Sequence, residues 1–484
     1  MDRRTFIGVT GATSLGLANR LGFAESEPLL KLLEDSPRER IPRELATRIR
    51  AGTRYEDLLA ALTLATVRNV QPYPDVGFKY HVVMMLRSIN ATALHLPAAD
   101  KWLPLVWAAD YFKDTQAQER AATGWRQSAR PQLTAGVADP RAALIAALDH
   151  WDHDAADAAI VRYARSASPD QIFSVLFPYG ARDLRAIGHK AIAVSNAHAL
   201  TQLVGSAQAS EPLLRSTVAA LLNSDSDSSP DSHDLAPDRP WRANLQRVSQ
   251  VPQSWKQGRD DAGARAELRS ALYRTSPEDV GAVVVTLLRR GISADAIWQV
   301  QFATAAELLV LQPGIVALHA QTTGNALHYA YRACDDERTQ LMLLLQGAAF
   351  VAMFRQMTGA AESDLNLGTL EPLGASGEGA LLEAFSDLTG GRRRQAVQKC
   401  LGYLLSGGDT DSVITAARRS LVLGAGEAHD FKLSEAVFEN LAQFPDTAWR
   451  ARFLSAGMAY FTAPLQRPRP LIAETMELLR DYNR

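Results

Sequence analysis

Histidine is the residue type from which this 484-residue chain could build a reactive site, because ten histidines accompany only two cysteines. The two thiols, Cys334 and Cys400, cannot form a thiolate metal cluster, although one disulfide bridge between them is open to them in an oxidising compartment. A metal ion would therefore be held by nitrogen and oxygen ligands. The sequence contains no HExxH or other compact metal signature, so such a site would have to be assembled from distant segments.

Helix geometry sorts the histidines. Each residue turns by about 100° around a helix, so side chains nine residues apart point to opposite faces and those three or four apart share a face. His189 and His198 are nine residues apart, as are His319 and His328. If each helix is continuous, each pair offers only one member to a shared site.

Three further histidines and a lysine follow the same reasoning. His81 and His95 lie on nearly the same face of a predicted helix, but about 20 Å of helix separates them, so only one can reach a given metal. His429 and Lys432 are three residues apart and can approach one point from a single helix. A lone histidine in a helical protein is more often a hydrogen-bonded core or surface residue, so spacing alone leaves both interpretations open.

Four separated segments each contain one of these histidines: Lys79–Met84, Ile187–Ile192, Leu318–Leu327 and His429–Ala436. In their order along the chain they resemble the histidine motifs of the questin oxidase-like family. The resemblance spans residues 75–440. It departs from the family at Lys79 and Tyr80, where the family has a more polar histidine-containing stretch, and at Lys190, where the family has glycine.

The resemblance implies a helical, cofactor-poor oxygenase that uses molecular oxygen on an aromatic or polyketide-like small molecule. Helix geometry allows only one histidine of each pair to reach a shared site, and the resemblance selects one histidine from each pair. Several neutral imidazoles suit iron(II), and zinc would also fit. The sequence carries no flavin, haem or nucleotide-binding motif. The metal ligands that the resemblance implies are His81, His189, His319, His429 and Lys432.

Lys432 is the unusual member of this set, because an ammonium group has no lone pair and is repelled by a divalent metal. Its side chain must be neutral, carboxylated on Nζ, or outside the ligand set. We favour carboxylation, since the carbamate would supply the negative charge that an all-histidine site lacks. Glu435, one turn beyond Lys432, could orient a ligand from behind.

Three polar residues, Thr322, Asn325 and Asn196, lie within a turn or two of these ligands. Each could bind substrate. Each could equally be a hydrogen-bonding residue at a contact between helices.

Two other functions compete with the oxygenase. In a non-enzymatic helical scaffold or interaction protein, the histidines would be structural. A zinc-dependent hydrolase is disfavoured because no obvious general-base carboxylate adjoins the histidines. Metal content separates the oxygenase from the scaffold, and oxygen consumption separates it from the hydrolase.

The elements that must position these residues are helices. Apolar residues recur three and four positions apart along most of the chain, and alternating strand-like runs are almost absent. This periodicity predicts an all-α fold. Because 47% of the residues are apolar, the chain can bury a large core, and we predict a single large multi-helix domain over residues 27–484. Predicted helices are Asp57–Val70, Phe78–His95, Asp183–Val204, Pro212–Asn223, Ala262–Tyr273 and Pro277–Arg290.

Two local signals refine this prediction. Ser276 followed by Pro277 is typical of a helix that starts at Pro277. Residues 223–240 are rich in Ser, Asp and Pro, the composition of a solvated loop that contributes nothing to a packed core. This loop should divide the helical chain into halves of similar size.

Composition argues against two kinds of partner. Lysine plus arginine (51) nearly balances aspartate plus glutamate (53), so the basic footprint of a nucleic-acid-binding protein is missing. The longest apolar stretch, Leu341–Phe354, is interrupted by Gln346 and is shorter than the roughly 20 residues of a membrane-spanning helix. We predict a buried core helix there and expect no membrane span.

The N-terminus resembles a twin-arginine export signal. Arg3 and Arg4 are followed by Thr5 and then two hydrophobic residues, and a mildly apolar segment runs to a cleavage boundary at Ala24. Residues 1–26 are therefore predicted to engage the twin-arginine export machinery and to deliver a folded protein to the periplasm or beyond. The alternative is an ordinary N-terminal helix on a cytoplasmic protein.

Overall fold

Helices make up the regular structure in the computed structural model. Among the residues that it describes, strand-like pairing is limited to one isolated bridge between Arg259 and Ile292. The predicted all-α fold is confirmed, whereas the predicted export signal in residues 1–26 lies outside the described residues. The structure describes residues 27–73, 79–133, 138–204, 210–223, 229–230, 232–374 and 378–480.

The helices fall into an N-terminal series, up to the loop that follows residue 222, and a C-terminal series. The first series is α2 (Glu27–Asp35), α3 (Ile41–Arg50), α4 (Tyr55–Asn69), α5 (His81–Met84), α6 (Leu86–Leu94), α7 (Leu103–Ala122), α8 (Pro140–Asp149), α9 (His153–Tyr163), α10 (Pro169–Ala181), the 3-10 turn η3 (Arg185–Gly188), α11 (His189–Val204) and α12 (Glu211–Leu222). The second series is α13 (Arg239–Arg247), α14 (Ala262–Arg274), α15 (Val280–Arg289), α16 (Ala294–Leu311), α17 (Ile315–Ala333), α18 (Glu337–Thr358), α19 (Glu378–Thr389), α20 (Arg393–Leu405), α21 (Thr410–Gly424), α22 (Ala428–Leu441), α23 (Thr447–Gly457) and α24 (Pro470–Leu478).

Side-chain caps fix many of the helix starts. Ser168 accepts a hydrogen bond from the Gln171 backbone N–H, and Gln171 reciprocates in a capping box at the start of α10. The side chains of Ser293 and Asp336 cap α16 and α18. Each accepts a hydrogen bond from the backbone N–H three residues further along the chain. Gly359 ends α18 in the left-handed conformation that glycine adopts without steric cost.

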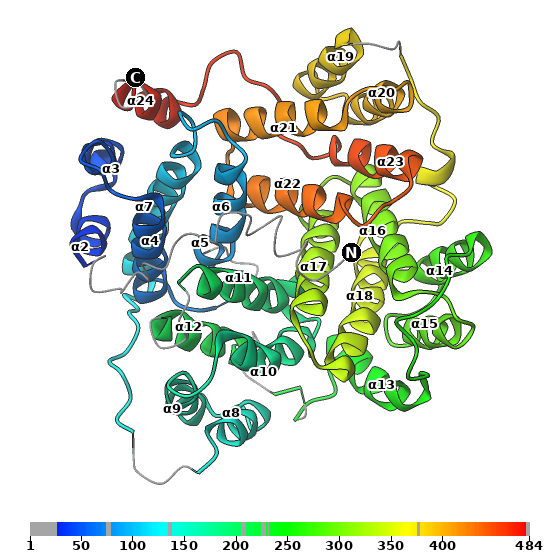
Figure 1. Cartoon of the computed structure of the whole chain (residues 1–484), viewed down its shortest axis with the longest axis horizontal. Coiled ribbons are helices and arrows are strands. Elements are labelled where there is room, and N and C mark those ends of the chain that lie inside the picture. Colours follow the sequence, from blue (N-terminus) through cyan, green and yellow to red (C-terminus); the bar gives the residue numbers. More distant parts are fainter. Residues whose placement is uncertain are drawn as a thin grey trace.

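The two series pack against each other instead of forming separate bodies. Helix α11 contacts α17, α10 contacts α18, α6 contacts α22, and α3 contacts α24. Figure 1 shows α5, α6, α11, α17 and α22 near the middle of the molecule, with α2–α4, α7 and α24 to one side. Four of these central helices, α5, α11, α17 and α22, carry the candidate ligands.

Helix α18 contains the longest apolar stretch. It is the one described helix long and apolar enough to cross a membrane, yet 72% of its most apolar window is buried inside the protein. It packs on α16 and α17, as well as α13 and α15. This placement is that of the core helix predicted for Leu341–Phe354.

Three predicted helices have different bounds in the structure. The Phe78–His95 helix is interrupted, because α5 ends at Met84 and α6 begins at Leu86. The Asp183–Val204 helix begins only at His189, after a turn in which Ala186 and Ile187 have left-handed φ angles of 49° and 47°. The third, α15, begins at Val280 instead of Pro277.

The predicted start of α15 at Pro277 is wrong. The Ser276 hydroxyl accepts a hydrogen bond from the Asp279 backbone N–H at 3.1 Å, so the serine does cap a turn. That turn is not yet α-helical, and α15 begins at Val280 with Asp279 as its N-cap.

Two further predictions are corrected by burial. The segment 223–240 was expected to stay out of the core, but Asp238 near its end is only 1% exposed and pairs with Arg185. The disulfide bridge is not formed, because Cys334 and Cys400 are both free and buried.

Candidate metal centre

Four histidines from four different helices meet in the interior. His81 is the first residue of α5 and His189 the first of α11, while His429 lies in the first turn of α22 and His319 in the second turn of α17. Each is at most 1% exposed. These are the histidines that the sequence motifs select.

Their rings form a tight cluster. The Nε2 atoms of His81 and His429 are 3.1 Å apart, and those of His189 and His319 are 2.8 Å apart. The ring centroids of His81 and His189 are 4.7 Å apart, in an edge-to-face arrangement that links the two pairs. Ligand nitrogens of His81, His189 and His429 all lie within 4.8 Å of one another.

These distances fit a metal ion. Imidazole nitrogens bind at about 2.1 Å, so two of them at right angles around one ion are roughly 3 Å apart. The same separation also suits a hydrogen bond between two neutral imidazoles, in which one nitrogen donates and the other accepts. The arrangement is therefore compatible with a nitrogen-rich metal site and does not by itself require one.

Lys432 completes the cluster. It lies one turn beyond His429 on α22 and is 4% exposed, and its Nζ has no hydrogen-bond partner among the described residues. Burial lowers the pKa of Lys432 to about 7. An ammonium group without an acceptor would be costly here, so the neutral amine, which has a lone pair, is favoured.

The histidines are also held in the neutral form. Burial lowers the pKa of His81 well below its ordinary value, with Lys432 as the next cause. The pKa of His319 is likewise lowered well below its ordinary value, first by burial and then by His189. Burial and Lys432 lower the pKa of His429 against the opposing effect of Glu427. Neutral imidazoles have the lone pair that metal binding requires.

Two of the rings have a polar partner at Nδ1, the ring nitrogen on the side away from the cluster. His319 Nδ1 lies 2.5 Å from the Ile315 carbonyl oxygen, which can only accept, so the proton is on Nδ1 and the Nε2 lone pair faces the cluster. His429 Nδ1 lies 3.4 Å from Glu427 Oε2. Glu427 also accepts a hydrogen bond from the Tyr460 hydroxyl at 3.1 Å.

Glu427 and Tyr460 did not emerge from the sequence. Glu427 stands two residues before His429 and belongs to the cap of α22, and a carboxylate close to a candidate ligand was a usable signal. Tyr460 follows α23 and reaches Glu427 only through the tertiary fold.

Glu435 is held by other residues. It is 2% exposed and accepts two hydrogen bonds from Arg418, at 3.0 and 2.9 Å, and one from the Thr92 hydroxyl at 2.8 Å. These contacts tie α22 to α21 and α6. None of them reaches a candidate ligand.

The three predicted substrate-binding residues differ from one another. Asn325 is engaged, because its Nδ2 donates to Glu439 and Asn440 and its Oδ1 accepts from Arg87. Thr322 Oγ1 and Asn196 Oδ1 are buried and have no hydrogen-bond partner among the described residues. Only these two have a polar atom left over for another molecule.

The second member of each histidine pair lies elsewhere. His198 is hydrogen-bonded to the Tyr329 hydroxyl at 3.0 Å and to Asp170 at 3.1 Å. His328 packs against the ring of Trp298, and burial lowers its pKa to about 3. His95 is exposed at the end of α6 and its Nδ1 lies 2.8 Å from the Ala91 carbonyl oxygen.

Comparisons with protein-family models, curated proteins and solved structures found no match to this chain. The resemblance of its histidine motifs to the questin oxidase-like family stays a prediction. Function is therefore inferred from the residues that the fold brings together.

Proposed function

We propose that this protein is a non-haem, iron-dependent oxygenase of a distant questin oxidase-like type. The observation that carries the proposal is the meeting of four buried imidazoles from four helices, with Nε2 atoms 2.8 and 3.1 Å apart. His81, His189, His319 and His429 would hold the metal, with Lys432 beside them. The substrate would be an aromatic or polyketide-like small molecule, with oxygen as the second substrate.

The composition of the cluster favours a ligand over a purely structural role. A helical scaffold gains most from apolar side chains at such central positions, because burying polar groups has a desolvation cost that hydrogen bonds only offset. Lys432 sharpens this contrast, since its Nζ is buried and no described residue is its hydrogen-bond partner. A bound metal would give the nitrogens of His81, His189 and His429 a common partner, with His319 and Lys432 beside them.

Imidazole ligands suit iron, zinc, copper and nickel, and the motif resemblance favours iron among them. When bound, iron(II) would supply the reactivity toward oxygen that the side chains of the protein lack. The histidines would fix the ion through neutral nitrogens. Ile315 and Glu427 would hold two of the rings in place from behind.

Lys432 would contribute an anionic oxygen as a carbamate. The neutral amine attacks the carbon of carbon dioxide, a nitrogen–carbon bond forms as one carbon–oxygen π bond opens, and one proton leaves to solvent. The product carries one negative charge and two oxygen atoms. Both α11 and α22 begin at the cluster, and the partial positive charge at their N-termini would stabilise that anion.

Thr322 and Asn196 would bind the substrate. Thr322 stands three residues after His319 on α17, and Asn196 stands seven residues after His189 on α11, so each shares a helix face with a candidate ligand. Their free oxygen atoms suit the hydroxyl groups of a phenolic or polyketide-like molecule.

The test is bound metal, measured by elemental analysis on protein purified without chelator. We expect about one iron per chain, lost on His319→Ala and retained on His328→Ala. His328 is a matched control, because it lies on the same helix and is 3% exposed but is outside the cluster. Oxygen consumption by the iron-loaded protein would distinguish an oxygenase from a zinc hydrolase. Absence of metal in all three proteins would leave the scaffold function.

A further inference from the structure

The chain enters α11 through an unusual turn. Ala186, Ile187 and Gly188 have φ angles of 49°, 47° and 84°, so three consecutive residues are left-handed directly before His189. This conformation is unfavourable for residues other than glycine and most of all for a β-branched residue such as Ile187. Such strain persists only where the surroundings hold it, so the contacts around the turn are informative.

Helix α17 holds the middle of the turn. The Thr323 hydroxyl donates a hydrogen bond to the Ile187 carbonyl oxygen at 3.3 Å. A Cβ atom on Gly188 would lie 2.3 Å from Thr323 Oγ1, so only glycine permits this approach. Thr323 is one turn beyond His319, so the left-handed turn packs against the helix that carries His319, whose Nε2 lies 2.8 Å from that of His189.

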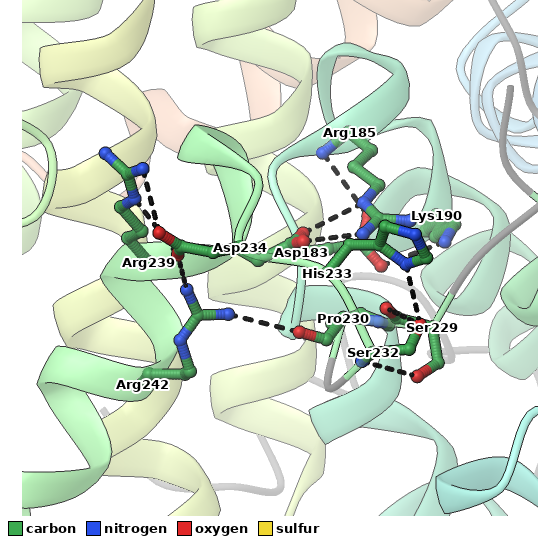
Figure 2. Close-up of polar contacts among 11 residues, drawn as sticks. Asp183, Arg185, Lys190, Ser229, Pro230, Ser232, His233, Asp234, Arg239 and Arg242 are labelled. Atoms are coloured by element: carbon green, nitrogen blue, oxygen red, sulfur yellow. Dashed lines mark hydrogen bonds and ion pairs between the residues drawn. The ribbon is translucent and has the colours of Figure 1, made fainter. Parts of the chain in front are cut away.

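Buried charges hold both ends of the turn. Asp183 accepts a hydrogen bond from the Arg185 backbone N–H at 3.3 Å and one from Lys190 Nζ at 2.9 Å. Asp183 thus joins the residue that opens the turn to the residue that follows His189. Figure 2 shows Asp183, Arg185 and Lys190 close together beside the segment that includes Ser232 and Asp234.

That segment supplies the second acid. Arg185 donates to both carboxylate oxygens of Asp238, at 2.9 and 2.5 Å, and the Leu184 N–H donates to the Pro237 carbonyl oxygen at 3.0 Å. Asp183, Lys190 and Asp238 are each 1% exposed and Arg185 is 8% exposed. We call these four residues the charge clamp.

Another residue with a strained backbone conformation lies against the charge clamp. Trp151, with φ of 58°, is the one other non-glycine residue of positive φ in the described part of the chain. Its ring is 4.9 Å from Lys190 Nζ. All the positive-φ non-glycine residues described here therefore belong to this region or contact it.

Stability alone does not account for the clamp. Replacing a buried ion pair by apolar side chains of similar volume is often neutral or stabilising, because desolvation offsets the attraction between the charges. Hydrogen-bonded charges do impose one geometry, however, and the geometry imposed here is that of the residues leading into His189.

We propose that the charge clamp is a positioning device that holds the left-handed turn and thereby presents His189 Nε2 to His319. This role rests on the proposed metal site. Asp183, Lys190, Arg185 and Asp238 are not themselves candidate ligands, and they act through the backbone at residues 185–190.

The test compares Asp183→Asn/Lys190→Gln, which leaves no unpaired buried charge, with Glu307→Gln. Glu307 is a matched control because it is 1% exposed and paired with Arg269 but lies on α16, outside the cluster. The metal-free proteins are titrated with cobalt(II) chloride, whose absorption spectrum reports the number of nitrogen ligands. We expect the clamp variant to bind cobalt roughly 10–100-fold more weakly with an altered spectrum, and the control to bind as the wild type does.

A double-mutant cycle separates positioning from general weakening. In a His189→Ala background the clamp substitutions should cause no further loss of cobalt affinity, because the residue they position is gone. Full additivity of the two effects, or a clamp variant with wild-type affinity and spectrum, would overturn the proposal.

Amide hydrogen exchange supplies a readout that needs no metal. The clamp variant should exchange faster over residues 184–190, while the rest of α11 and the control are unchanged. If the wild type binds no cobalt, the proposed metal site is wrong. Amide hydrogen exchange then tests by itself whether the charge clamp holds the left-handed turn. Unchanged exchange at the turn would then overturn it.

Discussion

His189 Nε2 and His319 Nε2 lie 2.8 Å apart although 130 residues separate them in the chain. The contact is made where the start of α11 meets the second turn of α17. It places the two rings at the separation expected of two ligands of one ion.

Replacement of His189 should remove the metal, whereas replacement of His198 should not. Both are buried on α11, but His198 faces Tyr329 and Asp170. We expect His189→Ala to lower iron content to a small fraction of the wild-type value and His198→Ala to leave it near one per chain. Elemental analysis together with a melting temperature for each variant checks this. Equal iron in both would contradict the assignment of His189.

The stability of the metal-free protein should rise with pH because of Lys432. Its pKa is about 7 in the folded protein against an ordinary value of 10.5, so between these values the unfolded chain binds more protons than the folded one. Lys432 therefore adds a slope of up to about 1.4 kcal/mol per pH unit above pH 7. Urea unfolding at pH 7, 8 and 9 should show this slope in the wild type.

Lys432→Met is the control for that measurement. It should remove the slope above pH 7. It should also reduce the contribution of the buried histidines at lower pH, because Lys432 helps to lower the pKa of His81 and His429. Identical slopes in the two proteins would show that Lys432 is charged in the folded state.

Carbon dioxide should modify Lys432 and not Lys190. Both lysines are buried, but Lys190 is paired with Asp183 at 2.9 Å and stays an ammonium, whereas Lys432 finds no hydrogen-bond partner in the part of the chain that the structure describes. We expect one carbamate carbon signal in the NMR spectrum of protein incubated with ¹³C-bicarbonate. The signal should disappear on acidification and be missing in Lys432→Met.

Thr322 and Asn325 should respond differently to loss of their polar atoms. Asn325→Ala removes a hydrogen-bond partner of Glu439, Asn440 and Arg87. We therefore expect a loss of about 1–3 kcal/mol in the free energy of unfolding. Thr322→Val removes a buried hydroxyl that no described residue hydrogen-bonds and should leave stability equal or higher. Urea denaturation measures both, and a large loss in Thr322→Val would show that its hydroxyl is a structural hydrogen-bonding group.

Residues 1–26 should direct export. Fused to a reporter protein that folds in the cytoplasm, they should carry it across the membrane of a bacterium with a twin-arginine pathway. Replacement of Arg3 and Arg4 by lysine should abolish transport. A reporter that stays in the cytoplasm with the unchanged segment would favour the ordinary N-terminal helix.

Local periodicity predicted helical segments that overlap α4, α6, α11, α12, α14, α15 and α18, and it limited each histidine pair to one member of the cluster. These predictions succeed because the helical repeat fixes which residues share a face within a segment. The interruption at Met85 was missed because nothing in its local pattern opposes a continuous helix. At the left-handed turn, Gly188 is the one local signal of a break, and a single glycine is weak evidence against a helix. The turn is held by a tertiary contact, the hydrogen bond from the Thr323 hydroxyl to the Ile187 carbonyl oxygen.

The burial of Asp238 was missed for a related reason. Its segment has the composition of a loop, and its partner Arg185 lies 53 residues away. Composition measures the average tendency of a segment, whereas one ion pair depends on a single residue that the fold brings near. The same limit hid Tyr460, which reaches Glu427 only after α22 and α23 have packed.

The 348 residues between His81 and His429 also set an order of events during synthesis. A growing chain on the ribosome carries three of the imidazoles long before the fourth, together with Lys432, leaves the exit tunnel. Shorter nascent chains can bury apolar surface but cannot present the complete set of donors. Metal capture by this cluster would therefore be a late event, and it would mark chains whose translation has passed α22.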